Sequence, residues 1–221
     1  MGMTKRIVLL GAPGVGKGTQ AKQLEDRFGW VHISTGDMLR EAIRSGTELG
    51  KKASQYVEKG ELVPDDLIIA MIEKQFQNGK CASGFILDGF PRTEVQAKKL
   101  DELLSRQGAP LDAVVSIEVP EEEIIRRLSQ RLTCKEGHVF PEDSEHKPGD
   151  PCPTCGAPLS RRKDDAPETV RRRLEVYKQQ TQSLIAYYRA QKILKPVDGV
   201  GSYETIFNRI LEVLGIASGS V

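Results

Sequence analysis

Aromatic side chains are scarce in this chain, at 5% of its 221 residues, with a single Trp. Proteins that bind single-stranded nucleic acid stack bases on such side chains, so this composition argues against that class. An excess of one charge is also lacking, because 32 Lys and Arg face 31 Asp and Glu and the formal net charge is +1. This balance argues against a protein built mainly to coat nucleic acid.

Long apolar runs are missing as well. No segment approaches the roughly 18 apolar residues of a membrane helix, and the N-terminus lacks the apolar core of a secretion signal. We therefore expect a soluble cytoplasmic protein with neither a membrane nor a nucleic acid as partner. A chain of 221 residues is long enough for one α/β domain with insertions.

A glycine-rich segment is the clearest feature that is present. An apolar run leads into GAPGVGKGT, residues 11–19, and an amphipathic helical stretch follows at residues 20–28. In this strand, loop and helix order, glycine-rich backbone amides and the helix N-terminus bind phosphate, and Lys17 can reach its terminal oxygens. Position 18 is glycine where most such loops carry Ser or Thr, and the hydroxyl is displaced to Thr19. We predict a phosphate-binding loop here.

Short apolar runs alternate with longer helical patterns along the rest of the chain. The predicted strands are residues 6–10, 30–33, 84–87, 113–119 and 193–197. The predicted helices include residues 94–107, 121–129 and 203–214. This alternation predicts an α/β fold with a parallel sheet, helices on both faces and ligands at the carboxyl ends of the strands. Residues 34–63 and residues 131–165 break the rhythm and are interpreted as insertions.

The second insertion contains three cysteines and two histidines. Cys134-x3-His138 and Cys152-x2-Cys155 supply three sulfurs and one nitrogen, a closed tetrahedral set suited to structural Zn²⁺. A segment of about 35 residues is too short to bury an adequate core, so a metal would stabilise it. His146 is an alternative nitrogen ligand, but His138 is favoured because it gives a compact first knuckle. Thiols without a metal are the second alternative.

Charged residues follow the third predicted strand and recur later in the chain. Asp88 ends an apolar strand and Arg92 lies just beyond a tight turn, where a carboxylate can orient the water shell of Mg²⁺ and an arginine can meet a phosphate. Arg127 and Arg131 are four residues apart in a predicted helix, hence on one face. Arg162 lies in a further charged segment.

Together these motifs resemble one family, the long-lid adenylate kinases. The motifs that match over about residues 5–214 are GAPGVGKGTQA, ISTGDMLR, GELVPDDL, FILDGFPRT and RKDDAPETVRRRL. The resemblance implies an α/β P-loop nucleoside-monophosphate kinase fold with a five-stranded parallel sheet flanked by helices. It divides the chain into a core (residues 1–33, 64–129 and 166–221), an NMP insertion that binds the nucleoside monophosphate (residues 34–63) and a lid with the metal site (residues 130–165). The implied reaction is reversible phosphoryl transfer from MgATP to AMP, giving two ADP, in a monomer.

The resemblance also implies a role for each matching residue. The catalytic set is Lys17, Asp88, Arg92, Arg127, Arg131, Arg162 and Arg173. The ATP-binding set is Gly14, Val15, Gly16, Lys17, Gly18, Thr19, Arg131, Val139, Phe140 and Gly201. The AMP-binding set is Thr35, Arg40, Glu61, Leu62, Val63, Gly89, Phe90, Pro91, Arg92, Gln96, Arg162 and Arg173. The metal set is Cys134, His138, Cys152 and Cys155, and the implied cofactors are Mg²⁺ with ATP and structural Zn²⁺.

Within these sets, the amides of residues 14–19 would hold the ATP phosphates, and Asp88 would place magnesium-bound water. Val139 and Phe140 would cover the ATP base. Asp164 and Asp165 would hold the lid arginines.

One departure and two alternatives accompany the resemblance. The zinc-lid pattern has Cys-x2-Cys in its first knuckle, whereas here position 137 is glycine and His138 follows, so the fourth ligand is open. A kinase that transfers phosphate from GTP to AMP would share the fold, and Gln96 favours adenine only at the acceptor. A zinc-knuckle protein that binds RNA through basic patches is the alternative from another class, and the full set of arginines argues against it.

Overall fold

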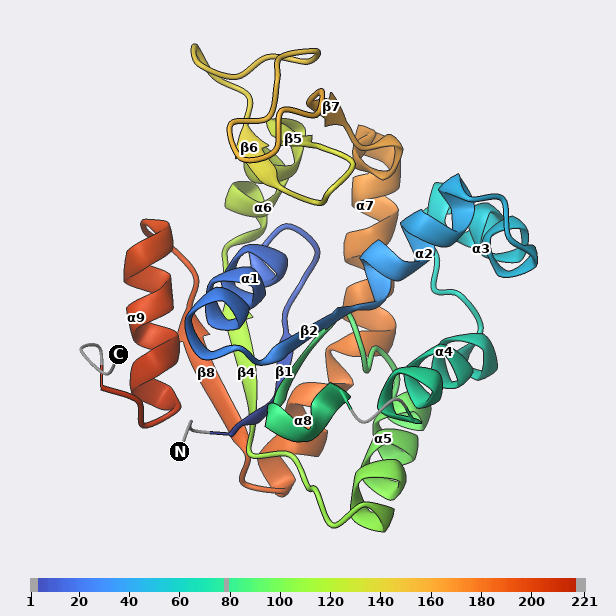
Figure 1. The fold of residues 1–221 in the computed structure, drawn as a ribbon, viewed down its shortest axis with the longest axis vertical. Coiled ribbons are helices and arrows are strands. Elements are labelled where there is room, and N and C mark those ends of the chain that lie inside the picture. The colour runs from blue at the N-terminus through green and yellow to red at the C-terminus, as the bar shows by residue number, and fades with distance from the viewer. Residues whose placement is uncertain (1–3, 78–79, 218–221) are drawn as a thin grey trace.

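The structure, a computed structural model, describes residues 4–77 and 80–217. At its centre lies a five-stranded parallel sheet (Figure 1). The strands are β1 (Arg6–Leu10), β2 (Val31–Ser34), β3 (Phe85–Asp88), β4 (Ala113–Glu118) and β8 (Leu194–Asp198). Their order is β2-β3-β1-β4-β8, so the chain builds first on one side of β1 and then on the other. The predicted α/β fold is confirmed, and such an order predicts a ligand beyond the carboxyl end of β1.

The strands lie within one residue of their predicted positions at each end. Two of the shifts have a local cause. Gly84 precedes β3 because it has φ of +107° and a Cβ there would lie 2.6 Å from the carbonyl oxygen of Lys5. Trp30 precedes β2, and its ring stacks on Phe28 with centroids 4.7 Å apart.

Side chains of β1 alternate between two cores, as a strand buried on both faces requires. Ile7 and Leu9 pack into a core with residues of α1, α6, α7 and α9, while Val8 and Leu10 pack into a second core with residues of α4, α5 and α8. These helices are α1 (Lys17–Phe28), α4 (Asp65–Gln77), α5 (Glu94–Arg106), α6 (Glu121–Ser129), α7 (Pro167–Val176), α8 (Ser183–Ala190) and α9 (Tyr203–Val213). The predicted helices at residues 94–107, 121–129 and 203–214 start and end within one residue of these bounds, whereas α1 begins three residues before the predicted stretch at residues 20–28.

The segment predicted as the NMP insertion (residues 34–63) contains α2 (Thr35–Arg44) and α3 (Glu48–Lys59), which project from the carboxyl end of β2 (Figure 1). Ser34 ends β2 and caps α2, since its hydroxyl accepts a hydrogen bond of 3.2 Å from the amide of Asp37. A Cβ at Gly50 would lie 2.0 Å from the carbonyl oxygen of Ala42, so only glycine allows α3 to pack this closely on α2.

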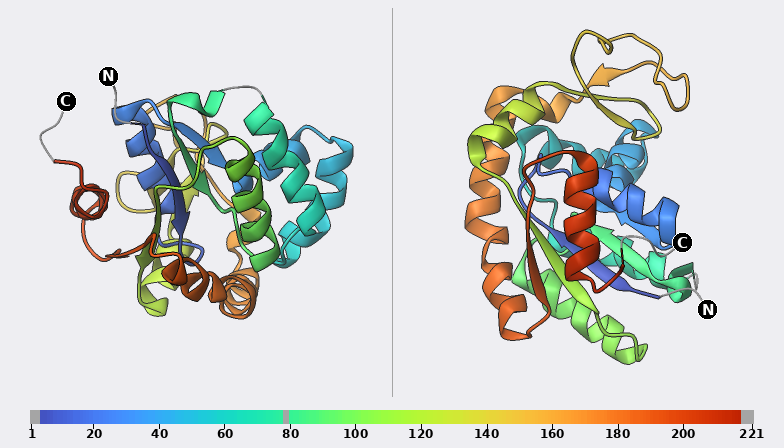
Figure 2. Two further views of the ribbon diagram at one scale, coloured as in Figure 1. Left: turned by 90° about the horizontal axis from the view of Figure 1, so that it is seen from below. Right: turned by 90° about the vertical axis from the view of Figure 1, so that its left-hand side faces the viewer.

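The lid (residues 130–165) rises above the carboxyl ends of the strands (Figure 1; Figure 2, right). It contains a three-stranded antiparallel sheet of order β6-β5-β7, made of β5 (Arg131–Thr133), β6 (Val139–Pro141) and β7 (Ser160–Arg161). A 3₁₀ turn, η2 (Lys163–Asp165), leads from β7 into α7.

This arrangement corrects one prediction. Helix α6 ends at Ser129 and Arg131 lies in β5, so Arg127 and Arg131 do not share a helical face. The reason is that the carbonyl of Gln130 already accepts a hydrogen bond from the amide of Glu142 at the start of the lid sheet.

A π-helical segment, η3 (Tyr177–Thr181), joins α7 to α8, so the chain crosses from the lid to the far end of the sheet almost without interruption. A single-turn π segment inside a helix is frequent at functional sites. Within residues 4–77 and 80–217, none of the helices has both the length and the apolar character that a membrane crossing requires.

Candidate functional site

The glycine-rich loop joins β1 to α1 at the carboxyl edge of the sheet. Gly14 has φ of +89°, and a Cβ there would lie 2.8 Å from the side chain of Leu128, so the turn requires glycine. Lys17 opens α1, and its Nζ donates hydrogen bonds to the carbonyl oxygens of Gly11 and Ala12 at 2.7 and 2.9 Å. Burial lowers the pKa of Lys17 to about 8, although the nearby Asp88 carboxylate opposes that shift.

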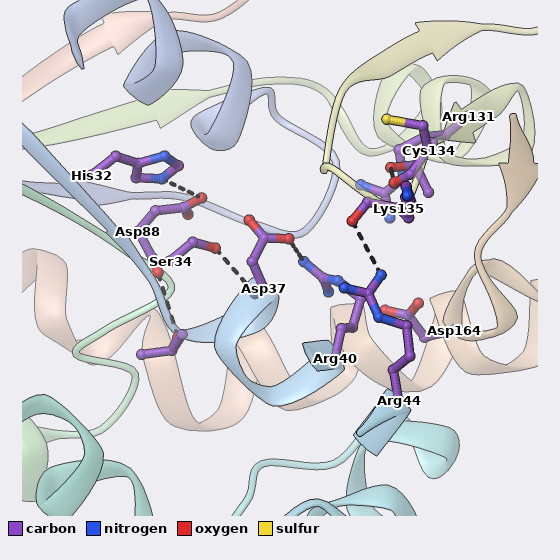
Figure 3. Close-up of polar contacts among 12 residues, drawn as sticks. His32, Ser34, Asp37, Arg40, Arg44, Asp88, Arg131, Cys134, Lys135 and Asp164 are labelled. Atoms are coloured by element: carbon purple, nitrogen blue, oxygen red, sulfur yellow. Dashed lines mark hydrogen bonds and ion pairs between the residues drawn. The ribbon is translucent and has the colours of Figure 1, made fainter. Parts of the chain in front are cut away.

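Asp88 lies at the end of β3, beside the loop. A Cβ at Gly18 would come within 3.3 Å of Oδ2 of Asp88, so a larger residue there would need the carboxylate to shift slightly. Nε2 of His32 on the neighbouring strand β2 lies 3.7 Å from Oδ2 of Asp88 (Figure 3). Burial alone would raise the pKa of Asp88, but His32 and Lys17 outweigh it and hold the pKa below its ordinary value. Asp88 is therefore an ionised carboxylate at the edge of the cavity.

A cavity of about 870 Å³ opens between the loop, the NMP insertion and the lid. Arginines from several elements line it. Nε of Arg92 donates to the carbonyl oxygen of Gly89 at 2.9 Å. Arg127, on α6, donates to the carboxylate of Glu123 at 2.8 Å and to the carbonyl oxygen of Gly199 at 3.0 Å.

Two carboxylates of η2 hold further arginines at the lid end of the cavity. Arg131 donates to both oxygens of Asp165, at 2.8 and 2.5 Å, in a bidentate pair. Arg173, on α7, lies 3.0 Å from a carboxylate oxygen of Asp164 and 3.2 Å from one of Asp165. Such fork-to-carboxylate pairs fix the guanidinium planes. Arg162 has no such partner, and its buried Nε lacks a hydrogen bond within the described chain.

Several of these arginines are buried close together, and their pKa values are lowered as a result. Burial, together with repulsion from other arginines of the cavity, lowers the pKa of Arg92 to about 10 and that of Arg162 to about 9. The pKa of Arg173 is also lowered, mainly by burial. A bound phosphate group would add negative charge among these cations.

The structure brings nearly all residues of the predicted nucleotide sets together. Those that line the large cavity are Gly14, Val15, Gly16, Lys17, Gly18, Thr19, Arg40, Leu62, Asp88, Gly89, Pro91, Arg92, Arg127, Arg131, Val139, Phe140, Arg162, Arg173 and Gly201. A second cavity, of about 70 Å³, is lined by others of the AMP-binding set, namely Thr35, Glu61, Leu62, Val63 and Gln96. Phe90 lines neither cavity, because its side chain is buried in the core beside the sheet.

The predicted metal residues form one cluster in the lid. One ligand atom of each of Cys134, His138, Cys152 and Cys155 lies within 4.8 Å of all the others. Nδ1 of His138 is 3.4 Å from Sγ of Cys134 and 3.5 Å from Sγ of Cys152, and the Sγ atoms of Cys134 and Cys155 are 3.6 Å apart. These separations match the edges of a ligand tetrahedron around Zn²⁺, about 3.5–3.8 Å for bond lengths near 2.0–2.3 Å. His146 does not belong to the cluster.

The acidity of Cys152 also suits a metal, although the pKa of its neighbour Cys155 is raised, because desolvation and the other two thiols outweigh a hydrogen bond from the backbone amide of Ala157. Desolvation alone would raise the pKa of Cys152. Hydrogen bonds from the backbone amides of Thr154 and Cys155 to its Sγ outweigh that effect, and the pKa is lowered to about 6. A thiolate is the form that binds a metal ion. The cluster can therefore hold a metal ion, and no nucleotide-site residue is needed for it.

Comparison with known proteins decides the family. A family model described as adenylate kinase matches residues 9–193. The chain belongs to the adenylate kinase family. It is 48% identical over 214 residues to an adenylate kinase of Archaeoglobus fulgidus, covering 94% of this chain and 97% of the relative. It is also 48% identical over 215 residues to an adenylate kinase of Thermodesulfovibrio yellowstonii, covering 95% and 98%. The resemblance that the motifs indicated is confirmed.

Several residues of this adenylate kinase site escaped the sequence analysis. His32 lies beside Asp88 only because β2 and β3 are neighbours in the sheet. The carboxylate of Asp65 accepts hydrogen bonds from Nε2 of Gln96 at 2.7 Å and from the hydroxyl of Thr93 at 3.1 Å, which fixes the Gln96 amide. The hydroxyl of Thr181, in η3, donates to the carbonyl oxygen of Arg92 at 2.9 Å. Of these residues only His32 had a signal in the sequence, because it is a polar residue inside an apolar strand.

One contact joins the two insertions of this adenylate kinase directly. Nη1 of Arg44, at the end of α2, donates a hydrogen bond of 3.1 Å to the carbonyl oxygen of Lys135 in the lid (Figure 3). Lys135 follows the metal ligand Cys134, so the contact lies beside the metal cluster. The NMP insertion and the lid therefore meet across the cavity.

Proposed function

We propose that the chain catalyses reversible transfer of the terminal phosphoryl group of MgATP to AMP, giving two ADP. One observation carries the proposal: a large cavity has a phosphate-binding loop on one side and buried arginines within it, and a second, smaller cavity at the NMP insertion shares Arg40 and Arg92 with it. The family name of the relatives supports the same pair of substrates.

The chemistry needs positioning and positive charge more than it needs a base. An oxygen of the AMP phosphate is already an anion, and it attacks the γ-phosphorus of ATP. The bond from that phosphorus to the β–γ bridging oxygen breaks, and the electron pair leaves with ADP. Because both reactants are anions, the obstacle is their repulsion, and fixed arginines that stabilise the equatorial oxygens remove it.

We assign the donor side to the loop and the lid. The amides of residues 14–19 and Nζ of Lys17 would hold the β- and γ-phosphates of ATP, so Lys17 would leave its present carbonyl partners for phosphate oxygens. Arg131 and Arg127 would meet the transferring group from the lid end. Val139, Phe140 and Gly201 would contact the donor base and ribose.

We assign the acceptor side to the NMP insertion and the loop after β3. Arg40 and Arg92 would bind the AMP phosphate, and Gln96 with residues 61–63 would bind the adenine in the smaller cavity. Thr35 would contact the same nucleotide. Arg162 and Arg173 would stand between the two nucleotides. These arginines converge on one cavity rather than spreading over an open face, which favours mononucleotides over an RNA strand.

Two metal ions fit the donors that the chain offers. Mg²⁺ bound with ATP would neutralise phosphate charge, and Asp88 suits its water shell because the carboxylate is ionised and borders the cavity. The lid cluster has the three thiols and one imidazole that suit structural Zn²⁺. We also infer that the chain acts as a monomer, since one chain supplies both sides of the cavity.

The test is ADP formation from MgATP with AMP, alongside GMP, CMP and UMP as acceptors and GTP as donor. We expect rapid turnover with AMP alone among the acceptors and with ATP as donor. Turnover with GTP and AMP would keep the site assignments and change the donor. Failure with every pair, together with salt-sensitive RNA binding, would overturn the proposal. For substitutions of Arg162, the matched control is R161A. Arg161 is an exposed neighbour that pairs with Glu142 on the lid surface.

A further inference from the structure

An aromatic pair lies in the lid beside the donor end of the cavity. The rings of Phe140 and His146 are stacked, with centroids 4.9 Å apart and planes inclined by 27°. Phe140 borders the large cavity and His146 does not. The imidazole therefore lies behind the phenyl ring as seen from the cavity.

Phe140 needs support from outside its own strand. It lies in β6, a three-residue strand at the edge of the lid sheet whose only strand neighbour there is β5. On that side its cross-strand partner is Leu132, and its side chain packs against the small apolar core of the lid. A second surface against this ring, which borders the cavity, would further restrict the orientations open to it.

The loop after β6 holds His146 in place to provide that surface. Nδ1 of His146 lies 3.2 Å from Oδ1 of Asp143. The same carboxylate oxygen accepts hydrogen bonds from the amides of Glu145 and His146, at 2.8 and 2.9 Å, and the amide of Asp143 donates to the carbonyl oxygen of His146. The loop is closed on itself, and the side chain of His146 is only 18% exposed.

We propose that His146, oriented by Asp143, positions the ring of Phe140 as the platform on which the donor base stacks. His146 is then a positioning residue for the donor nucleotide, and it is not the fourth metal ligand. The inference rests on the proposed function, since that function makes Phe140 a donor-base contact. A platform held in its bound orientation beforehand improves binding, because less side-chain freedom is lost when the base arrives.

The test measures steady-state kinetics and binding by calorimetry in the full-length protein. Replacing His146→Ala removes the supporting ring, and we expect KM and Kd for ATP to rise about three- to tenfold, the range typical of one aromatic contact. KM for AMP should change less than twofold, because none of the hydrogen bonds described for residues 143–147 joins this loop to a residue of the AMP-binding set. His146→Phe keeps a flat ring against Phe140, so we expect KM for ATP to return to within twofold of the unchanged protein.

Metal content separates the positioning role from a ligand role. Zinc bound per chain should stay the same in H146A and fall in H138A, since only His138 belongs to the cluster. Lys147 is an exposed neighbour in the same loop, so the substitution Lys147→Ala should alter none of these values.

Three results would overturn the inference: an unchanged KM for ATP in H146A, equal increases in both KM values, or loss of zinc from H146A. If the unchanged protein turned over no nucleotide pair, the proposed function itself would have failed. That outcome is distinct from active protein with an indifferent His146.

Discussion

At the scale of single residues, the site is dominated by cations that the fold buries together. Lys17 and Arg162 have pKa values lowered to about 8 and about 9, first by desolvation and then by neighbouring positive charge. A group with a depressed basic pKa destabilises the folded protein at neutral pH, because the unfolded chain holds the same proton more readily. The nucleotide site is therefore built at the expense of stability, and bound phosphate relieves the repulsion.

Lys17 should give the reaction an alkaline limit. As the pH rises through about 8, Lys17 of the free protein loses its proton and with it the charge that attracts ATP phosphates. We expect kcat/KM for ATP to fall above about pH 8, while kcat holds to higher pH because bound phosphates raise the pKa of Lys17. Rate profiles at saturating AMP between about pH 6.5 and 10 measure this. A kcat/KM that stayed level to the top of that range would contradict it.

Replacing Arg162 should raise the stability of the protein and lower its activity. Its charge is partly buried and its Nε has no hydrogen-bond partner among the described residues, so Arg162→Met should raise the melting temperature by a few degrees. The same change should lower kcat by about 10³-fold, the scale on which a phosphoryl-transfer arginine acts. Thermal denaturation and turnover of R162M and R161A, the control used above, measure both effects. A lower melting temperature in R162M would show that the arginine stabilises the fold.

At the scale of elements, the lid is the part least able to fold by apolar burial. Its strands have three, three and two residues, and its buried core consists of Leu132, Cys134, Cys152, Ala157 and Leu159. Two members of that core are the metal-cluster cysteines themselves. Burial of so few side chains cannot offset the ordering of the segment, so we expect a metal ion bound by the cluster to supply much of its stability.

Removing one thiol should therefore destabilise the lid and leave the chemistry largely intact. We expect Cys155→Ser to reduce bound zinc and to lower the melting temperature by roughly 10 °C, since several kcal/mol are lost and each shifts the midpoint of a domain this size by about 2–4 °C. Well below the transition, kcat should fall less than threefold. Metal analysis, thermal denaturation and turnover test this, with Cys81→Ser outside the cluster as control. Loss of turnover while C155S is still folded would contradict the separation.

At the scale of the whole molecule, the sequence predicted what local order determines. The strand–loop–helix order located Lys17, and alternation of apolar runs located the sheet to within one residue. The shared face of Arg127 and Arg131 was wrong, because pairing of β5 with β6 ends the helix and helical spacing carries no information about such pairing. His32 and Asp65 were missed because their partners are far away in the chain, at Asp88 and Gln96.

The Arg44–Lys135 hydrogen bond affects how easily the two insertions separate. When the two insertions separate, this hydrogen bond between exposed groups is exchanged for bonds to water. A bond of this kind contributes about 1 kcal/mol net, roughly twice the thermal energy at room temperature. By itself it therefore shifts the balance between joined and separated insertions by only about fivefold. Helix α3 also contacts η2 in the lid, so the Arg44 contact is one part of what holds the two insertions together.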